Sequence, residues 1–413
     1  MKILWVNSGF LHPTTKGGHI RTLEMLKELH RRHEIHYVAF ADSAYPEGVE
    51  RSGEYCTRAY PVPNRIPLRG SPAFAGQMIA NLLSSMPLPV SRYQSAAMAD
   101  SIRRLRNQER FDAIVCDFLF PSANFDSLEN CVLFEHNLET AIWERQAGTA
   151  TNPFLRAYFG LQARRMFVYE REVCRKVAQV IAVSPADAEK MRKRFDIQHV
   201  TDVPTGVDVE HFSPPDAIER SSDLVFIGSM DWMPNIDGVC YFVEEIFPIM
   251  LAQRPSCTLA IVGRRPAPKV KLLAERNPNI RVTGTVPDIR PHLWGSLVSI
   301  VPLRIGSGTR LKIYESMAAN VAVVSTSIGS EGLEIHPPED IRIADDPRQF
   351  ARQCLELLED AETRGRVAEA GRRLVSSRFS WAQVTRRMED LLTATPAGHA
   401  LMPRKSGKNF PKL

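Results

Sequence analysis

The sequence predicts an α/β protein built from two doubly wound domains. Short β-rich runs alternate with helical patterns along nearly all of the chain, and most of these runs are continuously apolar, as in parallel strands covered on both faces. The chain has 413 residues, of which 44% are hydrophobic and 24% charged, so it exceeds one ordinary domain and has the composition of a folded protein. These values exclude a disordered, collagenous or disulfide-stapled chain.

The first half begins with an apolar strand at 3–6, an amphipathic helix over 18–33 and a second strand at 35–40. Further apolar runs at 113–116, 132–134 and 180–183 predict buried strands, and we expect at least six strands between residues 2 and 203. In such sheets ligands bind at the carboxyl ends of the strands. The functional groups are therefore expected in the loops that follow these runs.

A break in the pattern at 203–223, rich in Pro, Gly, Ser and Asp, predicts the domain boundary. Six further strands follow, read as LVFIG, LAIVG, IRVTG, LVSIVP, VAVVST and IRIA. We assign residues 1–204 to one Rossmann-like domain, 205–222 to a linker, 223–378 to a second Rossmann-like domain, 379–395 to a helix crossing back to the first domain, and 396–413 to a disordered basic tail. A ligand is expected in a cleft between the two facing domains, which would close on it.

The charge of the chain argues against nucleic-acid binding. The net charge is +5, but four basic residues lie in the tail, so the folded body is close to neutral. Seven scattered cysteines without a CxxC pair fit a reducing compartment. Neither a signal peptide nor a membrane-spanning run is predicted, which favours a cytoplasmic protein.

The most informative segment is 301–334, where a strand leads through Gly306-Ser307-Gly308 into a helix from about Thr309 to Ala319. Backbone amides at a helix N-terminus bind phosphate, and glycines allow close approach. Arg310 and Lys312 oppose the helix dipole in the first turn, which is unfavourable unless an anion binds there. This local conflict predicts a phosphate site.

Glu315 lies seven residues beyond Gly308, close to two turns and about 10 Å along the helix axis. A diphosphate at the helix start would place a ribose beside this carboxylate, which accepts hydrogen bonds from a vicinal diol. Two other interpretations remain open. The helix is an ordinary surface helix with a Lys312–Glu315 ion pair, or Gly306-x-Gly308 begins a dinucleotide fingerprint whose third position is Leu311.

The segment PLRIGSGTRLKIYESMAANVAVVSTSIGSEGLE resembles the donor-binding region of glycosyltransferase family 4, which comprises retaining enzymes of the GT-B fold. Gly17-Gly18, FEHN at 134–137, VIAVSPAD at 180–187, VPTGVDVEHF at 203–212 and VFIGSMDWMPNIDG at 225–238 agree in order, over roughly residues 1–392. The chain most resembles bacterial transferases that build exopolysaccharide or other surface glycans.

The resemblance implies catalytic roles for His136, Arg310 and Lys312, with His136 facing the donor sugar. It implies donor contacts from Gly17, Gly18, Gly228, Gly306, Ser307, Gly308, Thr309, Leu311 and Glu315. The family's first glutamate falls at Ser307, and the arginine and lysine usual after the first strand of the second domain are absent. A plain turn at Gly17-Gly18 and a structural role for His136 remain the alternatives.

Two further features are ambiguous. The arginines between 156 and 175 either face an anionic acceptor or lie on a solvated helix face with Glu170 and Glu172 as partners, and we favour the solvated face. The apolar residues at helical spacing after Phe74 either pack in a core, which we favour, or face lipid.

The sequence therefore predicts a metal-independent, retaining glycosyltransferase that moves a sugar from a nucleotide diphosphate donor to a glycan or lipid-linked acceptor. No Asp-x-Asp pair and no His/Cys cluster with metal spacing occur, so neither a metal nor a cofactor is expected. The alternatives are a nucleotide-sugar epimerase on the same fold and a catalytically inactive nucleotide-sugar-binding homologue. Peripheral contact with the inner membrane is possible for a lipid-linked acceptor.

Overall fold

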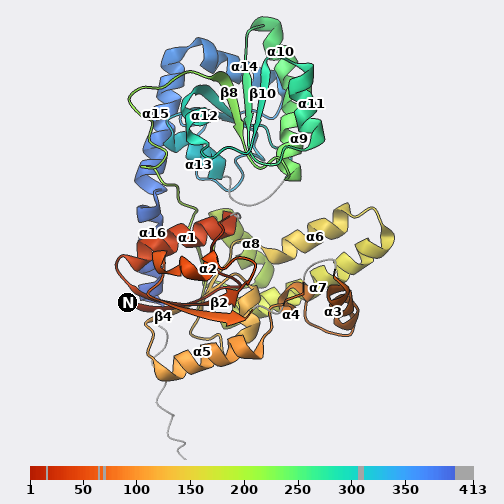
Figure 1. Ribbon diagram of the computed structural model, residues 1–413, viewed down its shortest axis with the longest axis vertical. Helices are drawn as coiled ribbons and strands as arrows, with labels where there is room; N and C mark the ends of the chain where they lie inside the picture. Colours follow the sequence, from red (N-terminus) through yellow and green to blue (C-terminus); the bar gives the residue numbers. More distant parts are fainter. Residues whose placement is uncertain (15–16, 64–65, 68–70, 306–310, 396–413) are drawn as a thin grey trace, which may run out of the picture. The chain divides into compact units, whose positions relative to one another are not determined.

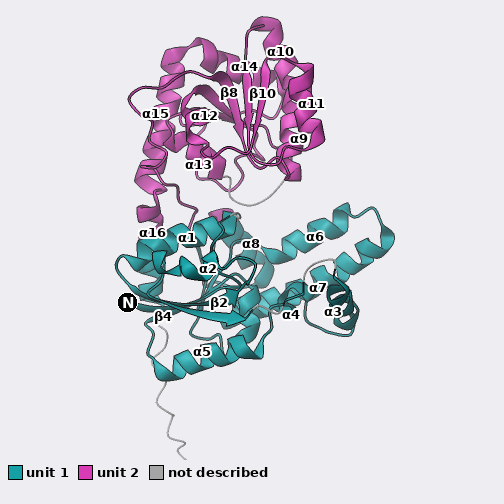
Figure 2. Cartoon of the chain, viewed as in Figure 1, with its two compact units in different colours: residues 1–182, 187–202, 387–413 teal, residues 183–186, 203–386 magenta. Residues whose placement is uncertain are grey.

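The computed structural model describes residues 1–14, 17–63, 66–67, 71–305 and 311–395. The chain forms two compact units (Figure 2). Unit 1 contains residues 1–182, 187–202 and the chain from 387 onward, and unit 2 contains residues 183–186 and 203–386. Each unit is an α/β fold with its own parallel sheet, as the sequence predicts.

In the described part of the chain, the sheet of unit 1 has the strand order β3-β2-β1-β4-β5-β6-β7, and neighbouring strands pair in parallel (Figure 1). Its strands are β1 (Lys2–Val6), β2 (Glu34–Ala41), β3 (Arg58–Pro63), β4 (Ala113–Asp117), β5 (Val132–Phe134), β6 (Gln179–Ala182) and β7 (Val200–Asp202). The order reverses between β1 and β4, so the switch point of unit 1 lies at the carboxyl ends of these two strands.

The helices of unit 1 connect these strands and cover the sheet. They are α1 (Gly17–His30), α2 (Glu47–Glu50), α3 (Pro72–Leu82), α4 (Leu88–Ser91), α5 (Ala96–Gln108), α6 (Glu139–Thr149), α7 (Pro153–Lys176) and α8 (Pro185–Phe195), with short 3-10 turns at Ser52–Glu54 and Phe120–Asn124. Helix α1 begins where the glycine pair predicts it, and its apolar residues Leu23, Leu26 and Leu29 are buried.

The sheet of unit 2 has the strand order β10-β9-β8-β11-β12-β13, again in parallel. Its strands are β8 (Ser222–Ile227), β9 (Leu259–Val262), β10 (Ile280–Gly284), β11 (Ser296–Val301), β12 (Ala322–Ser325) and β13 (Arg342–Ile343). All six strands coincide with the apolar runs of the sequence. The order reverses between β8 and β11, which defines the switch point of unit 2.

The helices of unit 2 pack on this sheet (Figure 1). They are α9 (Met233–Tyr241), a π-helical turn at Phe242–Ile246, α10 (Phe247–Gln253), α11 (Pro268–Arg276), α12 (Arg290–Trp294), α13 (Leu311–Ala318), α14 (Pro347–Glu359) and α15 (Ala361–Arg378). The last helix, α16 (Trp381–Ala394), begins in unit 2, and its residues from Arg387 onward belong to unit 1. There the Glu389 carboxylate accepts hydrogen bonds from Arg32, at 2.7 and 3.0 Å.

Helix α3 does not pack in a core, contrary to the interpretation that we favour from its apolar spacing. Ile79, Leu82 and Leu83 are 69%, 50% and 95% exposed. The end of the helix is held by polar contacts instead: the Arg165 guanidinium on α7 donates to the backbone oxygens of Asn81 (2.8 Å) and Leu82 (2.9 Å). The apolar face is therefore left at the surface of unit 1.

Candidate active site

The switch point of unit 2 contains several of the predicted donor-binding residues. Gly228 directly follows β8, and Leu311 is the first residue of α13, which follows β11. Gly306, Ser307, Gly308, Thr309 and Arg310 lie outside the described residues. Ligands of doubly wound sheets bind where the strand order reverses, so the topology places Gly228 and the start of α13 at the expected position.

Lys312 is directed toward the end of β8. Its Nζ donates to Asn235 Oδ1 at 2.8 Å and lies 4.4 Å from the centre of the Phe226 ring. A Cβ on Gly228 would lie only 2.6 Å from Asn235 Nδ2 and 2.9 Å from Lys312 Nζ, so only glycine leaves room for both groups. The structure thus brings Gly228 and Lys312 together, and it adds Asn235 as the group that positions the ammonium.

Glu315 lies almost one turn beyond Lys312 on α13 and is partly buried. Burial raises the pKa of its carboxyl to about 7, and the nearby Lys312 charge offsets part of that rise. Among the described residues its side chain has no hydrogen-bond partner, and it forms no ion pair with Lys312, whose ammonium bonds Asn235 instead. A carboxylate held in this way is suited to accept hydrogen bonds from ligand hydroxyls.

A further cation near this switch point is missed by sequence reasoning. Arg264 follows β9, and its Nε donates to Ser229 Oγ at 3.1 Å, immediately after Gly228. The two loops are in close contact, because a Cβ on Gly263 would lie 1.7 Å from Gly228 O. The signal in the sequence was Gly263-Arg264-Arg265 after an apolar run, at the end of the strand beside β8.

The switch point of unit 1 is centred on Asp117, the last residue of β4. Its buried carboxylate accepts four hydrogen bonds. Trp5 Nε1, Asn7 Nδ2 and Thr22 Oγ1 donate to Oδ2 at 2.9, 2.6 and 2.9 Å, and His136 Nε2 donates to Oδ1 at 2.7 Å. The donors come from β1, the loop after it, α1 and the loop after β5, so Asp117 connects the elements that meet at this point.

His136 lies at the carboxyl end of β5, as predicted, and is 6% exposed. Burial lowers the pKa of its imidazole below the usual value, while the Asp117 charge works in the opposite direction, so the ring is neutral near pH 7. Its ring stacks on the ring of Phe118, with the centroids 3.9 Å apart. Phe118 has a backbone φ of 67°, a value that residues other than glycine rarely adopt. Backbone strain of this kind is typical of functional sites.

The glycine pair lies beside His136. A Cβ on Gly18 would lie 2.7 Å from Phe118 Cζ and 3.5 Å from His136 Nδ1, whereas a Cβ on Gly17 would meet nothing within 4 Å. Both residues begin α1. Gly18 is therefore needed for the close approach of α1 to His136. Gly17 has no such packing role.

Arg21, on the next turn of α1, is a second cation that sequence reasoning did not select, and it is buried. It is 2% exposed, and its guanidinium lies 4.4 Å from the centre of the Phe134 ring. Burial lowers its pKa to about 9, with Asp117 opposing the change, so the group remains charged at pH 7.

Glu135, Glu139 and Glu170 form a buried group of carboxyls beside this site. Glu170 was expected on a solvated helix face, and that expectation is wrong: it is fully buried and accepts from the backbone N–H of Glu139 and Thr140, both at 2.8 Å, at the start of α6. Burial raises the pKa of Glu170 to about 7 and that of Glu139 to about 8. Both carboxyl oxygens of Glu135 are buried without a hydrogen-bond partner, and its pKa is raised well above the usual range, mainly by burial.

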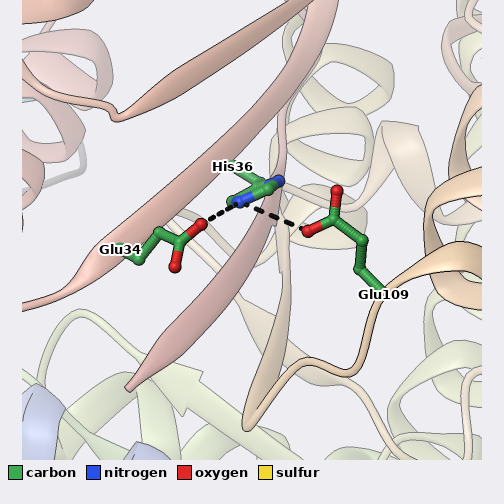
Figure 3. A group of neighbouring side chains, drawn as sticks. All are labelled: Glu34, His36 and Glu109. Atoms are coloured by element: carbon green, nitrogen blue, oxygen red, sulfur yellow. Dashed lines mark hydrogen bonds and ion pairs between the residues drawn. The ribbon is translucent and has the colours of Figure 1, made fainter.

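The side chains of Glu34, His36 and Glu109 carry possible metal-ligand atoms that all lie within 4.8 Å of one another (Figure 3). The spacing of these residues in the sequence does not match a metal-binding motif, so the sequence does not predict the group. His36 Nε2 lies 2.8 Å from Glu34 and 3.7 Å from Glu109. Lys2 Nζ is 3.4 Å from Glu34 and also pairs with Glu109, so a side-chain cation already neutralises these carboxylates. The group lies at the amino end of β2, away from the carboxyl ends where both switch points lie.

Within the described ranges, no helix combines the length and the apolar character that crossing a membrane requires.

Two parallel doubly wound sheets with charged and polar groups at their switch points are the features of a GT-B glycosyltransferase, an enzyme that uses a nucleotide-sugar donor. Residues 15–211 match the model of Glycosyltransferase Family 4, and residues 221–360 match that of the Glycosyl transferases group 1. The two matches together span most of the chain. The chain belongs to the group 1, family 4 glycosyltransferases.

Among curated proteins, the chain is 20% identical over 372 residues to a 44.6 kDa protein in the cps region of Klebsiella pneumoniae, covering 86% of this chain and 90% of that protein. It is 24% identical over 250 residues to a GDP-mannose-dependent monoacylated α-(1-6)-phosphatidylinositol monomannoside mannosyltransferase of Corynebacterium glutamicum, covering 55% of this chain and 66% of that protein.

Among solved structures, sucrose-phosphate synthase from Thermosynechococcus elongatus matches with a TM-score of 0.67 at 15% identity, covering 95% of this chain and 98% of that one. Anabaena Alr3699/HepE in complex with UDP also matches with a TM-score of 0.67, at 13% identity, covering 95% of this chain and 100% of that one. These structural likenesses establish the GT-B fold.

Proposed function

We propose that this enzyme transfers a hexosyl group from a nucleoside diphosphate sugar to a hydroxyl of a glycan or lipid-linked acceptor, with retention of the anomeric configuration and without a metal. The observation that carries the proposal is that Lys312 and Glu315 lie almost one turn apart on α13, at the switch point of unit 2. The UDP bound by the Anabaena relative supports a diphosphate nucleotide as the leaving group.

In this mechanism the main task of the protein is electrostatic. As the glycosidic bond breaks, negative charge develops on the departing diphosphate, and Lys312, with Arg310 two residues earlier in the sequence, stabilises it. Arg264 adds a third cation from the loop after β9. The departing phosphate takes the proton of the acceptor hydroxyl while the sugar is oxocarbenium-like, so no side-chain base is required. Glu315 binds the ribose diol and fixes the position of the nucleotide.

His136 faces the transferred sugar with a neutral ring. Buried beside Gly18 and stacked on Phe118, it contacts a hydroxyl of the transferred sugar. A neutral imidazole neither repels the cationic sugar of the transition state nor competes with the diphosphate for Lys312. The nucleotide is therefore recognised through charge and the sugar through hydrogen bonds.

A panel of nucleotide sugars, assayed for transfer and for slow hydrolysis, tests the proposal. We expect one nucleotide and one sugar, or a small set, to be consumed at rates that a chelator does not change, with retention visible by NMR of the product. Loss of activity with chelator and recovery with a divalent ion would contradict the metal-independent mechanism. No turnover of any donor that binds would identify a non-catalytic homologue.

For the acceptor, we propose a molecule of surface polysaccharide synthesis, which the enzyme meets at the cytoplasmic face of the membrane. Exposed Ile79, Leu82 and Leu83 give unit 1 an apolar surface, and exposed Arg156 and Arg164 on α7 add positive charge that complements anionic lipid. We expect sedimentation with phosphatidylglycerol vesicles and less with phosphatidylcholine. Ile79→Gln with Leu83→Gln should abolish it, while Leu272→Gln in unit 2, 40% exposed, should not.

A further inference from the structure

We infer that Asp117 is a positioning residue that fixes the proton of His136 on Nε2, so that Nδ1 is presented as a hydrogen-bond acceptor for a single sugar hydroxyl. The inference rests on the proposed function. It assigns a role to a residue that neither the sequence motifs nor the family comparison selects, and it specifies the chemistry of the group that His136 recognises.

The hydrogen bonds that Asp117 accepts determine which ring nitrogen of His136 carries the proton. Trp5 Nε1 and Asn7 Nδ2 are obligate donors, and they occupy Oδ2 together with Thr22 Oγ1. Oδ1 faces His136 Nε2 at 2.7 Å. Because a carboxylate with these partners can only accept, the contact requires a proton on Nε2. The Asp117 carboxylate and the His136 ring are both buried, so water cannot substitute for either partner.

The second ring nitrogen is then left with a lone pair. His136 Nδ1 is buried and has no hydrogen-bond partner, an arrangement that is costly in a folded protein unless a ligand completes it. It lies on the side of Gly18, where a Cβ would come within 3.5 Å of Nδ1, so the glycine keeps the space beside this nitrogen free of a side chain. Burial lowers the pKa of the imidazole, which keeps Nδ1 unprotonated at neutral pH.

This geometry selects for a donor group on the ligand. A hydroxyl can give its hydrogen to Nδ1, whereas a carbonyl, a carboxylate or a phosphate oxygen has no hydrogen to give and is rejected. The buried acceptor also penalises a deoxy sugar, because Nδ1 is then left unsatisfied. The Asp117–His136 pair therefore recognises one hydroxyl group of the sugar.

Asp117→Asn is the most specific test, because it keeps the shape of the side chain and replaces a hydrogen-bond acceptor with a donor. The carboxamide oxygen stays with the three donors at the Oδ2 position, so its NH₂ group faces His136 Nε2. The ring must then carry its proton on Nδ1 and presents a donor where the wild type presents an acceptor. The matched control is Asp112→Asn, an exposed position directly before the same strand.

Two measurements distinguish a positioning role of Asp117 from a purely structural role. In NMR of protein with ¹⁵N-labelled histidine, we expect His136 to be neutral with the proton on Nε2, and on Nδ1 in Asp117→Asn. Turnover should fall at least tenfold in Asp117→Asn with the Kd for nucleoside diphosphate unchanged, and should stay normal in Asp112→Asn. In a His136→Ala background, Asp117→Asn should cost nothing further, because both changes act through the same ring.

Deoxygenated donors identify the hydroxyl. Wild type should discriminate at least tenfold against one deoxy position, and His136→Ala should lose this discrimination.

Several outcomes would overturn the inference: a wild-type proton on Nδ1, full turnover in Asp117→Asn, or additive effects of the two variants. If Asp117→Asn does not fold, the wild-type proton position alone decides. If no donor is consumed by the wild type, the proposed function fails, while the proton position is still read directly by NMR.

Discussion

The switch points of the two units share a topology and differ in their side chains. In unit 1 the carboxylate of Asp117 is fully satisfied by four donors, and the neutral ring of His136 presents one lone pair. In unit 2 the cation of Lys312 is held by an amide oxygen, and the Glu315 carboxyl has no partner among the described residues. Under the proposed function, the same fold recognises one ligand group by a single hydrogen bond and another by charge. Three of the four changes below test this difference in recognition, and Glu135→Gln tests the buried carboxyls beside His136.

Lys312→Ala should have the largest effect on catalysis, because the ammonium stabilises charge that develops only as the diphosphate leaves. We predict a fall in kcat of about a hundredfold, the scale for removing one stabilising group at a developing anion. The control is Lys271→Ala on α11, an exposed lysine. Normal turnover with only a lower melting temperature would make Lys312 a structural residue.

Glu315→Gln should weaken nucleotide binding while stabilising the protein. Losing a charge-assisted bond to the ribose costs about 1.5–3 kcal/mol of nucleoside diphosphate affinity in calorimetry. The pKa of the folded carboxyl is about 7, above the usual 4.5, so wild-type stability falls as pH rises between these values. The variant avoids this loss and should be about 1–2 kcal/mol more stable at pH 8 but not at pH 4.

The control for that prediction is Glu275→Gln, an exposed glutamate on α11. It should change neither affinity nor the pH dependence of unfolding. Unchanged nucleotide affinity in Glu315→Gln would remove this carboxylate from the site.

Glu135→Gln tests the buried carboxyls beside His136. A raised folded-state pKa means that the wild type loses stability as pH rises above the unfolded-state value of 4.5, since the folded carboxyl holds a proton that the unfolded chain has released. In urea titrations the free energy of unfolding of the variant should depend less on pH between pH 5 and 8, and at pH 8 the variant should be more stable than the wild type. Exposed Glu129→Gln serves as the control. Parallel curves for wild type and Glu135→Gln would show that Glu135 is not protonated in the fold.

Gly18→Ala should have the smallest effect. Its Cβ would press on Phe118 Cζ and displace the ring that stacks on His136, so we predict a several-fold loss of transfer with nucleoside diphosphate affinity intact. Gly160→Ala on α7 is the control, since its Cβ would meet nothing within 4 Å, and alanine is the better helix former by up to about 1 kcal/mol. Equal activity of the two variants would show that the close approach at Gly18 has no catalytic role.

Much of the fold could be predicted because glycine and proline mark the strand ends. All six strands of unit 2 are visible as apolar runs, whereas β3 in unit 1 was missed: RAYPVP contains two prolines and is partly exposed. Proline is tolerated there because β3 is the edge strand of its sheet. Helix α3 shows the opposite error, since an apolar helical pattern cannot distinguish a core face from an exposed one.

Local sequence patterns selected some residues of the candidate site and missed others. Lys312 and Glu315 are visible because a cation in a first turn and a carboxylate two turns past a glycine loop are local patterns. Asp117 directly follows the apolar run predicted at 113–116 and was not selected, although it ends the strand next to β1. Its importance comes from donors that are 95 to 112 residues away in sequence. Glu170 shows the same limit, because its burial under the start of α6 depends on packing between helices.

The most direct test of the division of labour is calorimetry on His136→Ala with two ligands, the nucleoside diphosphate and an intact, non-transferable nucleotide sugar. Wild type should bind the intact donor more tightly than the diphosphate. In the variant the diphosphate affinity should be unchanged, while the advantage of the intact donor shrinks by at least tenfold. If both affinities fall together, or if the donor keeps its full advantage, His136 does not recognise the sugar and the account is wrong.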